Sequence, residues 1–144
     1  MSLDCIASGT HLVPLARALV DTTGAVLELG SGDFSTPFLR RYCLAAGREL
    51  LSLENYPKWA AEFGVPCVDY DVAIPAAARR EWSVVLVDHR PSERRIPDAI
   101  RFVGKTEYLL LHDYAHEIEG RPGVDVLTSA GSVTIDHDTL VLRR

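Results

Sequence analysis

The stretch AVLELGSGDFSTPFL (25–39) decides the fold of this chain. Its apolar residues lead up to Gly30 and predict a buried β-strand. Gly30 and Gly32 predict a tight turn, because glycine adopts positive φ values and leaves room for a ligand beside the backbone. Thr36 followed by Pro37 predicts the start of a helix, with threonine as the N-cap and proline at the first helical position. The stretch therefore encodes a strand, a glycine turn and a helix in direct succession.

The rest of the chain alternates strand and helix patterns with short turns between them. Continuous apolar runs predict parallel strands that are covered on both faces. Two apolar runs near the C-terminus, joined through 136–138, predict a β-hairpin. This alternation is typical of an α/β fold. The predicted strands are 49–54, 65–70, 82–87 and 107–111, and the predicted helices are 11–21, 37–46, 55–63, 73–80 and 97–103.

The composition is that of one ordinary globular domain. The 144 residues are 47% hydrophobic and 24% charged, so we expect a single domain over 1–144. The net charge of -5 argues against nucleic acid or an anionic membrane as a partner, since binding to phosphate demands clustered cations. No apolar run approaches the roughly 18 to 20 residues of a membrane span. We therefore expect a cytoplasmic protein, with Cys5, Cys43 and Cys67 as buried, reduced thiols.

Two acidic residues frame the glycine turn in the way that nucleotide-bearing ligands require. Glu28 precedes the glycines, and Glu54 closes the next apolar run, where a carboxylate can accept hydrogen bonds from ribose hydroxyls. Ser35 stands where the third glycine of an NAD-binding fingerprint would be, which disfavours NAD. This pattern resembles the class I S-adenosylmethionine-dependent methyltransferases. The glycine turn followed by Ser35 and Thr36 is most similar to the members that act on sugars and small hydroxylated molecules.

The resemblance implies a Rossmann-like, doubly wound and mostly parallel sheet with an antiparallel C-terminal hairpin. It also implies S-adenosyl-L-methionine as cofactor: Glu54 would hold the ribose, Asp69 or Asp71 would approach the adenine amine, and the two glycines would flank the methionine moiety. In such a sheet the residues that end each strand share one crevice. Each strand-end acid has a second interpretation, as the cap of the helix that follows it. The expected cofactor-binding residues are Glu28, Gly30, Ser31, Gly32, Ser35, Glu54, Asn55, Asp69 and Asp71.

A second polar group ends the two later strands. Asp88 follows the run 82–87, and His112 and Asp113 follow the run 107–111, so these three residues are candidate ligands of one divalent cation. Oxygen ligands favour Mg²⁺, whereas histidine shifts the preference towards Mn²⁺ or a similar ion. We assign a catalytic role to Asp88 and to His89, which is a candidate general base. The alternative is that His112 is a core histidine with no metal.

The sequence therefore predicts methyl transfer from S-adenosylmethionine to a small hydroxylated or amine-bearing acceptor. The alternative is a non-catalytic, cofactor-binding or partner-dependent module of the same fold, since so short a chain has no long insertion that could enclose a substrate. The C-terminal hairpin presents a free sheet edge, from which we expect a homodimer. The alternative is that charges at Asp136, Asp138, Arg143 and Arg144 protect this edge and keep the chain monomeric.

Overall fold

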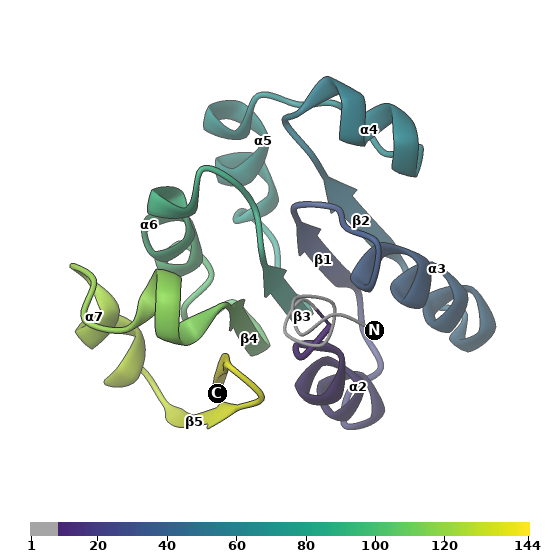
Figure 1. Cartoon of the computed structure of the whole chain (residues 1–144). Helices are drawn as coiled ribbons and strands as arrows, with labels where there is room; N and C mark the ends of the chain where they lie inside the picture. Colours follow the sequence, from purple (N-terminus) through teal and green to yellow (C-terminus); the bar gives the residue numbers. More distant parts are fainter. Residues whose placement is uncertain (1–8) are drawn as a thin grey trace.

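The computed structural model describes residues 9–144, which form one six-stranded mixed sheet with helices on both faces (Figure 1). The strand order is β2-β1-β3-β4-β6-β5. The first four of these strands are parallel, and β6 runs antiparallel to both β4 and β5. The strands are β1 (Val26–Leu29), β2 (Leu50–Leu53), β3 (Trp82–Val87), β4 (Thr106–His112), β5 (Ser132–Asp136) and β6 (Thr139–Arg143). The predicted α/β class and the C-terminal hairpin are confirmed.

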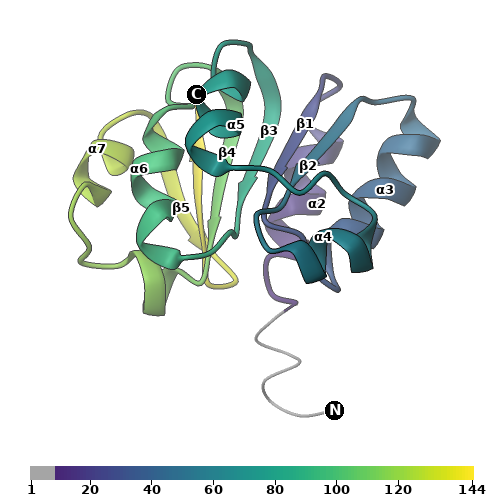
Figure 2. The same ribbon diagram turned by 90° about the horizontal axis from the view of Figure 1, so that it is seen from above.

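Two layers of helices cover the sheet, as Figure 2 shows from above. The helices α2 (Leu12–Val20) and α3 (Ser35–Ala46) pack on one face. The helices α5 (Tyr70–Ala77), α6 (Arg95–Ile100) and α7 (Val124–Thr128) pack on the other. The central strands are mostly apolar because their side chains alternate between these two cores. None of the helices in the described part of the chain is long and apolar enough to cross a membrane.

The start of α3 differs from the sequence prediction. The helix begins at Ser35 with Phe34 as its N-cap, so the prediction of Thr36 as the N-cap is wrong. The reason lies beneath the turn, where Glu28 accepts hydrogen bonds from the hydroxyls of both Ser35 and Thr36. These bonds draw both residues into the first helical turn. Pro37 is still tolerated there, because backbone N–H groups in the first turn have no partner within the helix.

The strand predicted at 65–70 is wrong, because this segment makes only one isolated bridge, between Glu54 and Cys67. Pro66 has no N–H to give to a ladder. Asp69 then caps α5 by accepting a hydrogen bond from the backbone N–H of Asp71 at 2.9 Å, so the helix begins at Tyr70 rather than at residue 73. As a consequence, β2 is an edge of the sheet.

The prediction of buried cysteines holds for only one of the two that the structure describes. Cys43 is buried in α3, whereas Cys67 is exposed because its segment is not covered as a strand would be. Cys5 lies outside the described residues.

The sheet has a switch point between β1 and β3. From β1 the chain passes through α3 to β2 on one side, whereas β3 pairs with the other side of β1. In doubly wound sheets the crevice beyond the carboxyl ends of two such strands is the usual place for a ligand. The remaining short elements near this edge are α4 (Pro57–Phe63), the 3₁₀ turn Ser92–Arg94 and the π-helical turn Tyr114–Ile118.

Candidate functional site

A cleft of about 450 Å³ lies at the carboxyl ends of β1, β3 and β4. Its volume is within the range of about 300 to 1,000 Å³ that small-molecule sites occupy. The glycine turn contributes residues 31–35, and α4 contributes Trp59, Glu62 and Phe63. The opposite wall consists of His11, Asp88, Arg90, Arg95, His112 and Asp113. The cleft therefore brings together side chains that are spread over more than 100 positions of the chain.

The two glycines of the turn have different roles. Gly30 has a φ of 88°, and a Cβ there would lie 2.6 Å from the Cα of His89. It is therefore required for packing of the turn against the segment that follows β3. Gly32 lines the cleft, and a Cβ there would meet nothing within 4 Å. Gly32 thus borders open space in the cleft, whereas Gly30 does not.

Glu28 lies beneath the turn and has no exposed surface. Its carboxyl group accepts hydrogen bonds from Ser35 and Ser52 at 2.5 Å and from Thr36 at 3.0 Å. Burial is the main cause that raises its pKa from 4.5 to about 7, against the opposing effect of these hydroxyls. The Thr36 hydroxyl also accepts from the backbone N–H of Gly32 at 3.0 Å. Glu28 therefore positions the turn and does not itself line the cleft.

Glu54 is buried, and its carboxylate accepts four hydrogen bonds from groups of the chain itself. One carboxylate oxygen accepts from the backbone N–H and the hydroxyl of Ser31, at 2.9 and 3.0 Å. The other accepts from the backbone N–H groups of Asn55 and Tyr56, both at 2.9 Å. These four bonds use the capacity of a carboxylate. A ribose hydroxyl would reach Glu54 only by displacing one of them, so this side chain holds the turn from the β2 side.

Asp69 and Asp71 are not brought to the cleft. Asp69 caps α5, as its second interpretation predicts, and Asp71 forms a 2.7 Å ion pair with Arg94. Neither residue lines the cleft, and neither does Asn55, whose backbone serves Glu54. Ser31 and Ser35 do line it.

The buried Arg95 links the two strand-end acids. Its guanidinium lies 3.1 Å from an oxygen of Asp88 and 3.0 Å from one of Asp113. It also donates to the backbone carbonyls of His89 and His112, at 2.9 and 3.2 Å. A buried arginine needs such partners, because an unpaired charge is costly away from water. Arg95 thus links the segment that follows β3 to the end of β4.

His112 makes close contact with Asp88. The imidazole Nδ1 lies 3.3 Å from Asp88 Oδ1 and 3.5 Å from Asp113 Oδ1, and Nε2 lies 3.1 Å from the hydroxyl of Thr10. Burial opposes the charged forms of both partners. The hydrogen bond and the opposite charges outweigh it, lowering the pKa of Asp88 and raising the pKa of His112.

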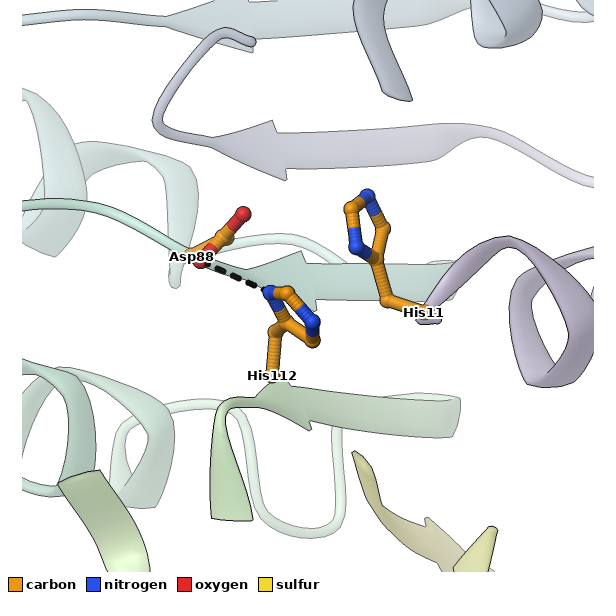
Figure 3. A group of neighbouring side chains, drawn as sticks. All are labelled: His11, Asp88 and His112. Carbon is orange, nitrogen blue, oxygen red and sulfur yellow. Dashed lines mark hydrogen bonds and ion pairs between the residues drawn. The ribbon is translucent and has the colours of Figure 1, made fainter. Parts of the chain in front are cut away.

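The residue that sequence reasoning missed is His11. It directly precedes α2, and its ring lies 4.2 Å from that of His112, measured between centroids. His11, Asp88 and His112 each offer one ligand atom, and these atoms lie within 4.8 Å of one another (Figure 3). Asp113, the third ligand expected from the sequence, is not part of this group. A signal did exist: a helix that leads by a short turn into β1 runs back along it, so its first residue lies at the carboxyl edge.

His89 lies outside the cleft and is almost completely buried. Its Nε2 is 2.8 Å from Asp98, and its ring packs edge-on against Tyr70. Within the described part of the chain its Nδ1 has no hydrogen-bond partner. This environment separates His89 from any substrate in the cleft, so the structure does not place it where a general base is needed.

Acidic and aromatic side chains form the mouth of the cleft. Asp33 and Glu62 are exposed and form no ion pair with another described residue. Phe34 and Trp59 are exposed large apolar residues beside them. Uncompensated carboxylates attract a cation, and aromatic faces bind planar rings and cations. The side of the mouth that carries Asp33 and Glu62 is therefore suited to a positively charged ligand with a planar group, and Arg90 adds a positive charge to the opposite wall.

No protein-family model matches this chain, and a comparison with curated proteins finds no similar sequence.

Proposed function

We propose that the cleft binds S-adenosyl-L-methionine beside Gly32 and that the protein transfers its methyl group to a small hydroxylated or amine-bearing acceptor. The observation that carries this proposal is the lining of the cleft at the switch point of the sheet. There an open glycine turn carries Asp33 and faces Glu62 of α4, neither acid has an ion-pair partner among the described residues, and exposed aromatic side chains lie beside them. S-adenosylmethionine carries a sulfonium, an ammonium and an adenine ring, which are the groups that such a lining attracts.

Glu28 and Glu54 hold the glycine turn in place without a ligand. Glu28 binds the hydroxyls of Ser35 and Thr36, and Glu54 binds Ser31. Such preorganisation lowers the entropy that binding must otherwise lose. In this proposal the two glutamates support the cofactor through the turn, and Asp33 and Glu62 supply the negative charge that the cofactor meets.

Methyl transfer breaks the bond between the sulfonium sulfur and the methyl carbon and forms a bond from that carbon to the acceptor oxygen or nitrogen. The sulfur keeps the electron pair and becomes a neutral thioether. The proton that the acceptor loses passes to water at the open mouth. The contribution of the protein is to hold donor and acceptor in line, which can replace a large part of the entropic barrier.

Calorimetry with S-adenosylhomocysteine and S-adenosylmethionine tests this proposal. Asp33→Asn and Glu62→Gln should each weaken S-adenosylmethionine binding about fivefold, which corresponds to about 1 kcal/mol for a partly exposed charge interaction. Glu119→Gln removes an equal charge at an exposed position outside the cleft and is the matched control. S-adenosylhomocysteine lacks the sulfonium charge, so its affinity should respond less to both cleft variants.

Two results would contradict the proposal. One is no heat of binding for either ligand. The other is equal weakening by Glu119→Gln, because the effect would then come from net charge and not from the cleft. Saturable binding without label transfer from methyl-labelled S-adenosylmethionine to any component of a small-metabolite extract would instead favour the non-catalytic module.

A further inference from the structure

Two histidines and one carboxylate converge in the wall of the cleft from three separate elements. His11 precedes α2, Asp88 follows β3, and His112 ends β4. One potential ligand atom from each lies within 4.8 Å of the others. Figure 3 shows the three side chains gathered in one place from these separate elements. Ligand atoms around a first-row metal lie about 2.0 to 2.2 Å from the ion, so their mutual separations are close to those that coordination requires.

We propose that His11, Asp88 and His112 form a binding site for one divalent transition-metal ion. The proposal does not depend on methyl transfer, because it rests on the donor set and its geometry. Imidazole nitrogen suits Zn²⁺, Fe²⁺ and Co²⁺, whereas Mg²⁺ prefers oxygen ligands. Two nitrogens and one carboxylate therefore select a transition metal over Mg²⁺.

The surroundings of the three residues resemble the support that metal ligands need. His112 Nε2 lies 3.1 Å from the Thr10 hydroxyl, which fixes the ring and directs Nδ1 towards Asp88. Such an outer partner orients a metal-binding histidine. Arg95 contacts Oδ1 of Asp88, and no described residue hydrogen-bonds to Oδ2. Asp88 therefore retains an oxygen for the ion.

The charge around the site also fits a divalent cation with open positions. Asp88 and Asp113 contribute two negative charges, and Arg95 contributes one positive charge. When both histidines are neutral, the net charge of these groups is one negative charge. A divalent ion changes this sum to one positive charge. All three ligands line the cleft, so the remaining coordination positions face it and favour an anionic oxygen ligand.

The test is a titration of the full chain, freed of metal by a chelator and dialysis, with Zn²⁺, Co²⁺ and Mg²⁺. We expect one Zn²⁺ per chain and weaker binding of Mg²⁺. Loss of an outer-shell partner alone commonly costs about 10- to 100-fold in metal affinity, so His11→Ala should weaken Zn²⁺ binding at least about tenfold. His116→Ala removes an exposed histidine outside the group and should leave the affinity unchanged.

Two spectroscopic measurements on the unchanged chain keep the proposal testable if a variant does not fold. Bound Co²⁺ should give visible bands without a thiolate charge-transfer band, which excludes Cys67 as the ligand. Zn²⁺ should shift the ring-proton signals of His11 and His112 but not those of His116 and His137. Absence of binding, stronger binding of Mg²⁺, a thiolate band, or equal affinity in His11→Ala would each overturn the proposal.

Discussion

Glu28 makes the stability of this protein depend on pH. Its pKa rises from 4.5 to about 7 because folding removes it from water. The folded state therefore binds the proton more tightly than the unfolded state, and this contribution to stability is complete below pH 4.5 and is lost as the pH rises to about 7.

Glu28→Gln should remove this pH dependence, because the amide is a neutral replacement that still hydrogen-bonds to the hydroxyls of Ser35 and Ser52. Urea unfolding at several pH values measures the effect. Between about pH 5 and pH 7, the free energy of unfolding of the wild type should fall by about 2 to 3 kcal/mol relative to the variant. Parallel pH curves for the two proteins would show that Glu28 ionises normally in the folded state.

The strand-end acids could be identified from the sequence, but most of their partners could not. Ser52 lies beside Glu28 because the register of β1 and β2 pairs these two residues, which are 24 positions apart. The sequence predicts Glu54 as a ligand-binding residue, and in the folded chain its carboxylate accepts hydrogen bonds from Ser31, Asn55 and Tyr56. A carboxylate at a strand end can accept hydrogen bonds either from a ligand or from the chain itself. Only the folded chain shows which donors reach it.

In the glycine turn between β1 and α3, Gly30 is needed for packing, whereas Gly32 lines the cleft. Gly30→Ala should destabilise the protein by about 1 kcal/mol or more, since its φ is 88° and the added Cβ would meet the backbone of His89. Gly32→Ala should leave the stability within about 0.5 kcal/mol, because the Cβ meets nothing. Thermal unfolding measures both effects.

The Gly32→Ala variant also tests ligand binding. Since Gly32 lines the cleft, Gly32→Ala should weaken S-adenosylhomocysteine binding about tenfold despite normal stability. Unchanged affinity in this variant would show that the ligand does not approach the turn.

The sequence predicted the central strands correctly, because their apolar patterns match their burial. It predicted a strand wrongly at 65–70, beside the edge strand β2. The runs that became β1, β3 and β4 are central strands with two covered faces, so their sequences are mostly apolar. The segment 65–70 has a similar pattern, but Pro66 and the cap at Asp69 outweigh it. Pro66 and the Asp69 cap therefore prevent 65–70 from forming a strand, although its residues favour one.

Across the whole molecule, a cleft at the carboxyl edge could be predicted from the alternation of strands and helices, whereas the contribution of His11 could not be predicted from local pattern alone. His11 is about 100 positions from His112 and joins it only because α2 runs back along the sheet. The expected homodimer stays a prediction. The structure shows β5 at an edge with Ile135 exposed, and Arg17 pairs with Asp136 at the end of that strand.

The most direct test of the central claim is the backbone amide spectrum of the ¹⁵N-labelled chain during addition of S-adenosylhomocysteine. Binding in the cleft should shift the amide signals of Ser31, Gly32 and Asp33 first, because this turn forms the wall that the ligand meets. Signals of the hairpin residues 132–143 should stay in place. An unchanged spectrum at saturating ligand, or shifts confined to residues outside the cleft, would contradict the assignment of this cleft to S-adenosylmethionine.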